Sequence, residues 1–338
     1  MAETARYRGR GVVGMALGPA LVVLAAFNCG GSPGPDPVIQ ALVDQVNQAN
    51  ISATVQDLSD PMALPEFTTR HTKSPTFPMV TDYLKQRCEG LGLTTSLHTW
   101  TRMSITASNV VCEISGATNP ENIYIIGAHY DSTTDPAPSP PDYEPAPGAT
   151  DNASGVAGAL EMARIFLTAN PGATLRFLFF AGEEQNLLGS KEYVEKLDAD
   201  GELNNVELML DIDEIGRIND LDPDNEVCNN PPAQTGPGML GVCLESSSAH
   251  ASVLDAFQSA GQLYTSLFFR RNLSPFGSDH ISFLNEGVPA LLTIEAYDGN
   301  NPVADTVNDV FAELDPELTA EIIKMNSAAL ARLVGVDP

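Results

Sequence analysis

The sequence is poor in positive charge and in cysteine. Seventeen lysines and arginines stand against 44 aspartates and glutamates, which gives a net charge of −27 over 338 residues. Such a surface repels nucleic acid and anionic lipid and favours solubility, so we expect no nucleic-acid partner. No two of the five cysteines form a CxxC motif, which argues against zinc–thiolate and thioredoxin chemistry.

The N-terminus has the features of an export signal. Three arginines in the first ten residues precede an apolar stretch, 12–27, that is too short and too interrupted by Gly and Pro for a membrane span. The run LAAFNCGG (24–31) resembles a bacterial lipoprotein box, although Asn28 stands where a small residue is usual. We therefore expect residues 1–29 to direct export to the cell envelope or the medium. Lipidation of Cys29, which would be the only membrane anchor, and simple secretion stay open as alternatives.

The remaining cysteines fit an exported protein. Without Cys29 they number four, an even count that allows two disulfides. The preferred pairs join neighbours in the sequence, Cys88 with Cys112 and Cys228 with Cys243.

The order of elements predicts an α/β fold. Strand-like runs rich in Val, Ile, Leu and Phe occur at 109–114, 123–128, 174–181, 206–213 and 289–295, and helical patterns at 38–50, 78–93, 155–168, 189–197, 249–260 and 316–334. This succession of strands and helices, with strands that show little alternation of apolar and polar residues, is typical of a doubly wound sheet covered by helices on both faces. We expect residues 30–37 to be a flexible tether and residues 38–338 to be one domain.

One histidine and several carboxylates lie at the ends of these apolar runs. His129 follows the strand 123–128, and Asp131, two residues on, points to the same side and can accept a hydrogen bond from the far ring nitrogen of His129. By itself HxD is weak evidence, because buried structural histidines are common. Asp151 opens a predicted helix, where the ordinary role of Asp is an N-cap, although a carboxylate there can also bridge two metal ions.

Two more strand ends carry paired acids. Glu183 and Glu184 follow TLRFLFFA, and adjacent glutamates in so apolar a context each need a partner. One binding a metal ion while the other takes a proton from water would satisfy both. Asp211 and Asp213 in VELMLDID are two residues apart, so strand parity cannot choose between them.

Taken together, these motifs resemble the co-catalytic zinc exopeptidases, typified by bacterial leucyl aminopeptidase, aminopeptidase S and glutamate carboxypeptidase-like enzymes. The likeness runs over about 250 residues, in the order FTTRHTKSP, GAHYDS, PGATDNASGVAG, AGEEQNLLGS, LDIDEIG and FGSDHISFLNEGVPAL. The fold it implies is a mixed, largely parallel sheet between helices.

The resemblance also implies roles and a cofactor. Two zinc ions are expected, one held by His129 and Asp213, the other by Glu184, with Asp151 bridging them. Asp213 is preferred over Asp211 because the family's aspartate is followed by two residues and a glycine. Glu183 would be the general base, Asp131 would support His129, and His280 would be structural. The substrates would be peptides with a free N-terminus.

One position departs from the family pattern. The family's last metal ligand is a histidine in a segment resembling His-Thr-x-x-Asp-Thr, and the matching stretch NPVADTVNDVFAELD (301–315) has Asp305 there. Asp305 as a ligand would set four carboxylates against two dications, a formally neutral centre that suits harder metals such as Mn²⁺ better. Alternatively, the shorter side chain leaves a mono-zinc enzyme, or catalysis is lost.

Three functions follow from these alternatives. The leading one is an exported metallo-aminopeptidase. A glutaminyl-cyclase-like transferase would use the same fold with a single zinc ion. A noncatalytic peptide-binding protein at the cell surface, anchored through Cys29, would keep the fold without turnover.

Overall fold

The computed structural model describes residues 34–135, 145–219, 239–275 and 277–336, and residues 35–338 form one compact unit. An eight-stranded sheet runs through it in the order β1-β2-β4-β3-β5-β8-β6-β7. The strands are β1 (Thr94–Arg102), β2 (Ile105–Ile114), β3 (Asn119–His129), β4 (Ala173–Phe180), β5 (Val206–Ile212), β6 (Gly241–Glu245), β7 (Phe268–Asn272) and β8 (Ala290–Glu295). β4, β3, β5 and β8 are adjacent and parallel, and antiparallel pairs lie toward both ends of the sheet.

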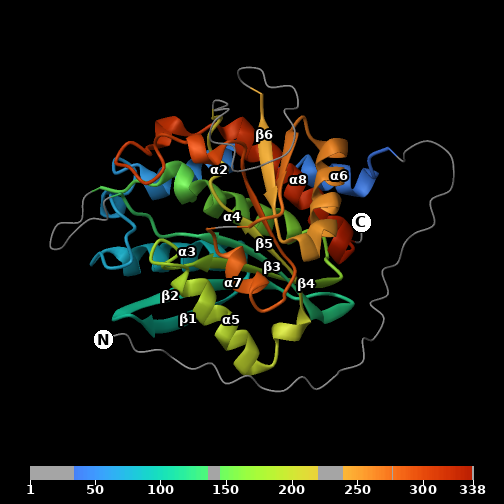
Figure 1. Cartoon of the computed structure of the whole chain (residues 1–338), viewed down its shortest axis with the longest axis horizontal. Coiled ribbons are helices and arrows are strands. Elements are labelled where there is room, and N and C mark those ends of the chain that lie inside the picture. The colour runs from blue at the N-terminus through green and yellow to red at the C-terminus, as the bar shows by residue number, and fades with distance from the viewer. Residues whose placement is uncertain (1–33, 136–144, 220–238, 276, 337–338) are drawn as a thin grey trace. The chain divides into compact units, whose positions relative to one another are not determined.

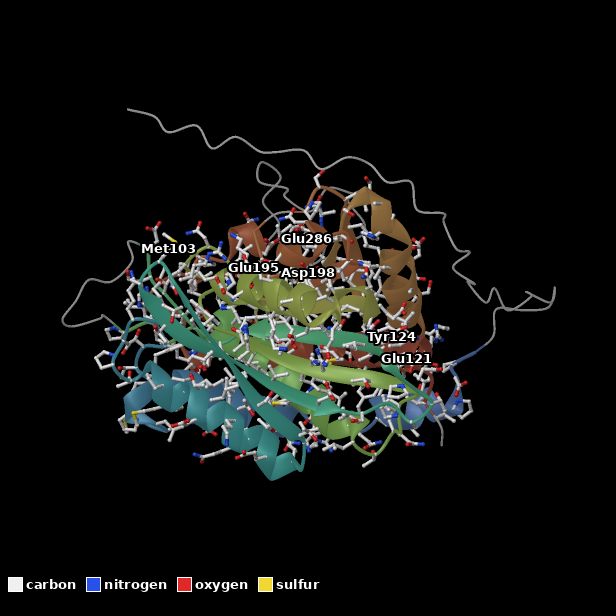
Figure 2. All side chains as sticks on the ribbon, turned by 90° about the horizontal axis from the view of Figure 1, so that it is seen from below. Met103, Glu121, Tyr124, Glu195, Asp198 and Glu286 are labelled. Atoms are coloured by element: carbon white, nitrogen blue, oxygen red, sulfur yellow. A yellow bond between two sulfur atoms is a disulfide. The ribbon has the colours of Figure 1, made fainter. Side chains whose placement is uncertain are left out.

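Helices cover both faces of this sheet (Figures 1 and 2). The helices are α1 (Pro37–Val43), α2 (Gln48–Ser59), α3 (Phe77–Leu91), α4 (Ser154–Phe166), α5 (Leu188–Asp200), α6 (Ala251–Tyr264), α7 (His280–Leu284) and α8 (Pro316–Val334). Single turns occur at η1 (Pro65–Phe67), η2 (Ala149–Ala153), η3 (Leu203–Asn205), η4 (Ser248–His250), η5 (Asp298–Asn300) and η6 (Phe311–Glu313). The mixed, largely parallel sheet between helices confirms the predicted fold.

Strand β4 explains why the sequence shows so little alternation. All eight of its residues are buried. Phe177 and Phe179 belong to the core that includes α2, α4 and α8, whereas Leu178 and Phe180 pack on the other face with Tyr193 of α5 and Phe283 of α7. A strand that is covered on both faces has no solvent-facing side, so most of its positions are apolar, and its one charged residue, Arg176, pairs with Glu113 and Glu202.

The predicted helix 38–50 is wrong, because two helices occupy this region. The first helix, α1, ends at Val43, and Asn47 starts the second. The side-chain oxygen of Asn47 accepts hydrogen bonds from the backbone N–H groups of Ala49 and Asn50 and so caps α2. Asn is one of the residues that favour this N-cap position. The edge strands β1 and β7, and β6 next to β7, were not predicted from the sequence.

None of the helices in the described ranges is long and apolar enough to cross a membrane. The predicted export signal and most of the predicted tether lie outside the described residues.

One predicted disulfide is present. Cys88 in α3 and Cys112 in β2 are bonded, and the cross-link ties the helix to the sheet. Cys243 is also disulfide-bonded, and its predicted partner Cys228 lies outside the described residues.

We predict that the double substitution Cys88→Ser/Cys112→Ser lowers stability by about 3 kcal/mol, because it frees a loop of 24 residues in the unfolded chain. Thermal unfolding without reductant should show a midpoint lower by about 5–10 °C. Reductant should then lower the midpoint of the wild type more than that of the variant. An unchanged midpoint in the variant would contradict the prediction.

Candidate metal centre

The carboxyl ends of β4, β3, β5 and β8 meet at one edge of the sheet because these strands are parallel neighbours. His129 is the last residue of β3, the pair Glu183 and Glu184 follows β4, and Asp213 follows β5. This is the edge where ligands bind in open α/β sheets. The topology therefore gathers residues that are far apart in the sequence.

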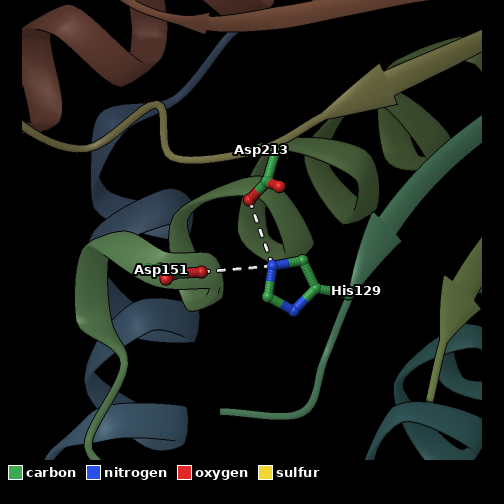
Figure 3. Close-up of side chains that lie close together, drawn as sticks. All are labelled: His129, Asp151 and Asp213. Carbon is green, nitrogen blue, oxygen red and sulfur yellow. Dashed lines mark hydrogen bonds and ion pairs between the residues drawn. The ribbon is translucent and has the colours of Figure 1, made fainter. Parts of the chain in front are cut away.

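His129 lies between two carboxylates (Figure 3). Its Nε2 is 3.1 Å from Asp151 Oδ1 and 3.1 Å from Asp213 Oδ1. Its Nδ1 is 3.2 Å from the backbone carbonyl of Asp131. A proton on Nδ1 can be donated to that carbonyl, which leaves the lone pair of Nε2 directed at the carboxylates. A tetrahedral zinc ion with bonds of about 2.0 Å separates its ligand atoms by about 3.3 Å, so both contacts of Nε2 have the spacing that such an ion needs.

The charges at this point support the same interpretation. Burial alone would lower the pKa of His129, but Asp213 and Asp151 outweigh it and raise the pKa well above its ordinary value. Burial also raises the pKa of Glu184 well above its usual range, and Asp151 and Glu183 raise it further. Carboxylates crowded in this way need a compensating cation.

Asp305 lies in the same cluster. Ligand oxygens of Asp151, Glu184 and Asp305 are all within 4.8 Å of one another, and atoms of His129, Glu183 and Glu184 form another such group. Burial, and then the charge of Asp151, raises the pKa of Asp305 to about 6. The structure thus brings together all five predicted metal ligands and Glu183.

Asp131 departs from its predicted contact with His129. Its carboxylate Oδ1 is 3.8 Å from His129 Nδ1 and instead accepts hydrogen bonds from the backbone N–H groups of Gly182 (2.9 Å) and Glu183 (3.2 Å). The backbone carbonyl of Asp131, not its side chain, is the partner of the imidazole. The side chain therefore fixes the loop that carries Glu183.

The contacts of Asp211 and Asp213 differ, which sequence parity could not show. Asp213 faces His129, whereas Asp211 is buried and its Oδ2 accepts from the backbone N–H of His280 at 2.8 Å. The hydroxyl of Ser278 lies 2.8 Å from Asp213 Oδ2 and 3.0 Å from Asp211 Oδ2. His280 is fully buried between Asp211 and Glu245 and lies outside the ligand cluster.

Sequence reasoning gave no role to Arg70, although it lies in the quoted motif FTTRHTKSP. Its side chain is completely buried and donates to the backbone carbonyls of Tyr130 (2.9 Å), Leu58 (2.9 Å), Gly148 (2.9 Å) and Pro147. Tyr130 lies next to His129, and Gly148 lies in the loop that leads to Asp151. Arg70 therefore fixes the spacing between two of the ligand-bearing segments.

Asp309 fixes the Asp151 loop from the other side. Its carboxylate accepts hydrogen bonds from the backbone N–H groups of Thr150 and Asp151, both at 2.9 Å, and from the Thr150 hydroxyl at 2.9 Å. Gly148 has a φ of 56°, and an added Cβ there would meet the Asp151 carbonyl and the Arg70 guanidinium. Asp151 does not cap α4, contrary to the ordinary role of Asp at a helix start, since Ala153 holds the N-cap position.

An α/β sheet that gathers one imidazole and several carboxylates at the ends of its parallel strands has the residues that a metal-dependent hydrolase needs. Residues 109–330, more than half of the chain, match the sequence model of peptidase family M28. The chain belongs to this family, and the predicted resemblance is confirmed. Membership implies a zinc-dependent peptidase.

One curated relative agrees with this assignment, and two solved structures share the fold. A probable zinc metalloprotease of Pyricularia oryzae is 30% identical over 90% of this chain and 68% of its own length. The LapA aminopeptidase of Legionella pneumophila has a similar fold, with a TM-score of 0.69, 20% identity, and coverage of 88% of this chain and 74% of its own. The glutaminyl cyclase of Macrostomum lignano gives a TM-score of 0.70 at 16% identity, over 93% and 97% of the two chains.

We predict that Arg70→Met weakens Zn²⁺ affinity by about 10- to 100-fold, because the segments bearing His129 and Asp151 lose their common donor. Arg176→Met is the matched control: Arg176 is also buried, in β4, but pairs with Glu113 and Glu202. Both variants should unfold at lower temperature, and only Arg70→Met should lose affinity in a chelator competition titration. Equal losses of affinity would contradict a positioning role, and Arg70→Lys, with fewer donors, should be intermediate.

Proposed function

We propose that this chain is an exported metallo-aminopeptidase that removes residues from the free N-termini of peptides. The observation that supports this most directly is the meeting of His129, Asp151, Glu184, Asp213 and Asp305 at one sheet edge, with Glu183 beside them. Membership of peptidase family M28 supports the reaction class.

In this proposal the metal centre has two positions that share Asp151. The His129 position consists of His129, Asp213 and Asp151, and the Asp305 position consists of Asp151, Glu184 and Asp305. Zinc held there would supply Lewis-acid chemistry, making a water molecule more acidic and polarising the scissile carbonyl.

Glu183 is the proposed general base. It accepts a proton from the attacking water on a carboxylate oxygen and later donates that proton to the nitrogen of the departing amine. Asp131 supports this role because its Oδ1 accepts a hydrogen bond from the backbone N–H of Glu183. A base fixed through its own backbone stays within reach of the reacting atoms during turnover.

Ser278 orients the metal ligand Asp213 in this mechanism. Its hydroxyl is within hydrogen-bond distance of Asp213 Oδ2, while Asp213 Oδ1 faces His129. One carboxylate oxygen is therefore kept for the metal ion, which is the usual effect of an outer hydrogen bond on a ligand.

We predict that Glu183→Gln lowers kcat for leucine anilide by about 10²- to 10⁴-fold, because the amide cannot accept the proton. Zn²⁺ affinity should stay within about threefold of the wild type, since the positioned ligands are untouched. Glu286→Gln, at an exposed position after α7 (Figure 2), is the control and should leave both quantities unchanged. Turnover of Glu183→Gln within about tenfold of the wild type would remove Glu183 from the mechanism.

The same assay separates the leading function from the alternatives. An aminopeptidase cleaves the free leucine substrate and leaves its N-acetylated form intact. A glutaminyl-cyclase-like enzyme, which the fold also resembles, would release ammonia from peptides with an N-terminal glutamine. A binding protein would retain metal and peptide without any turnover.

Export is proposed from the N-terminal sequence and tested separately. We predict that the full chain, produced in a bacterium supplied with labelled palmitate, incorporates label at Cys29 and fractionates with membranes, whereas Cys29→Ser does neither. Recovery of the unlabelled chain in the medium, beginning near residue 30, would support simple secretion instead. A cytoplasmic chain that keeps Met1 would contradict export.

A further inference from the structure

The two positions of the metal centre offer different donor atoms. The His129 position contains an imidazole nitrogen and the carboxylates of Asp151 and Asp213, whereas the Asp305 position contains three carboxylates and no nitrogen. His129 is the only histidine in any metal-capable group of the described residues. The two positions therefore differ in the donor atoms that this chain supplies, whichever ion is bound.

The oxygens of the Asp305 position are available for an ion. Glu184 Oε1 and Asp305 Oδ1 are both buried and have no hydrogen-bond partner within the described part of the chain. An unpaired buried carboxylate oxygen is costly. A cation between these groups would compensate both atoms at once, which a single added hydrogen-bond donor could not do.

Donor chemistry then separates the two positions. Imidazole suits zinc, whereas sites made of carboxylate, carbonyl and water suit Mn²⁺, Mg²⁺ and Ca²⁺. We infer that the centre is chemically asymmetric: the His129 position selects Zn²⁺, and the Asp305 position is an all-carboxylate site with a much weaker preference for Zn²⁺ over Mn²⁺. This inference rests on the metal centre of the proposed function but not on its turnover.

The backbone at Asp305 permits a direct exchange of the donor. Asp305 has a φ of 55°, in the left-handed region. Asp, Asn and His are the residues enriched several-fold there among non-glycine residues. Asp305→His and Asp305→Asn can therefore keep the local conformation, the first supplying a nitrogen donor and the second removing the charge at constant shape.

The test measures binding alone. Metal-free protein is titrated with Zn²⁺ against a chromogenic chelator, and the one-zinc protein is then titrated with Mn²⁺ while the signal of free Mn²⁺ is followed by electron paramagnetic resonance. Wild type, Asp305→His and Asp305→Asn are compared, with Asp198→His as a control on the exposed surface of α5 (Figure 2).

We expect the second equivalent in the wild type to show a Zn²⁺-to-Mn²⁺ affinity ratio at least about tenfold smaller than in Asp305→His. Asp305→Asn should weaken both metals at this position by about tenfold or more, and Asp198→His should behave as the wild type. X-ray absorption at the zinc edge of the one-zinc protein should show imidazole scattering from His129.

Three results would overturn the inference: equal ratios in the wild type and Asp305→His, unchanged second-metal binding in Asp305→Asn, or one-zinc protein without imidazole scattering. Its failure is distinguishable from failure of the proposed function. Hydrolysis of leucine anilide by a protein with two equivalent zinc ions would reject the asymmetry alone. Asymmetric binding without hydrolysis would reject the aminopeptidase alone.

Discussion

The mutual repulsion of buried carboxylates is the constraint on which this structure depends. Asp151, Glu183, Glu184, Asp213 and Asp305 meet at one sheet edge with a single imidazole among them. Burial raises the pKa of Glu183 and Glu184 well above the usual range, although His129 opposes it. Residues so crowded persist only where the surrounding structure holds them in place and a cation offsets their charge.

Backbone groups provide much of that support. Asp131 and Asp309 each accept hydrogen bonds from main-chain N–H groups beside a member of the cluster, and Arg70 donates to carbonyls on two neighbouring segments. Burial lowers the pKa of Arg70 to about 10, which leaves it charged at neutral pH. Its positive charge therefore lies near the acidic centre without neutralising any one ligand directly, so the carboxylates stay free for metal.

Sequence patterns predicted those features that depend on neighbouring residues, such as helix ends and the polar residues at strand ends. α8 was predicted with the observed bounds because Asp315 caps it and Pro316 opens it. The ligands at the ends of the parallel strands were predicted because acidic residues and a histidine that follow largely apolar runs stand out. β1 was not predicted, because it is an exposed edge strand of mixed, largely polar residues. The choice between Asp211 and Asp213 depends on their contacts with His129 and His280, and the role of Arg70 depends on carbonyls from three segments. Such long-range contacts leave no periodic signal.

Asp305 affects both the charge and the donor atoms of the proposed centre. In place of the family's histidine it would add a negative charge and supply an oxygen donor instead of a nitrogen donor. Asp151 is shared, so an ion at either position lowers the repulsion felt at the other, and the two sites cannot be independent. In the proposed centre with two metal ions and Asp305 as a ligand, four carboxylates would balance two dications. In the proposed mechanism, a neutral centre would polarise a carbonyl less than a cationic one and would leave more of the work of proton transfer to Glu183. The fixed backbone position of Glu183, held by Asp131, therefore gains importance in this chain.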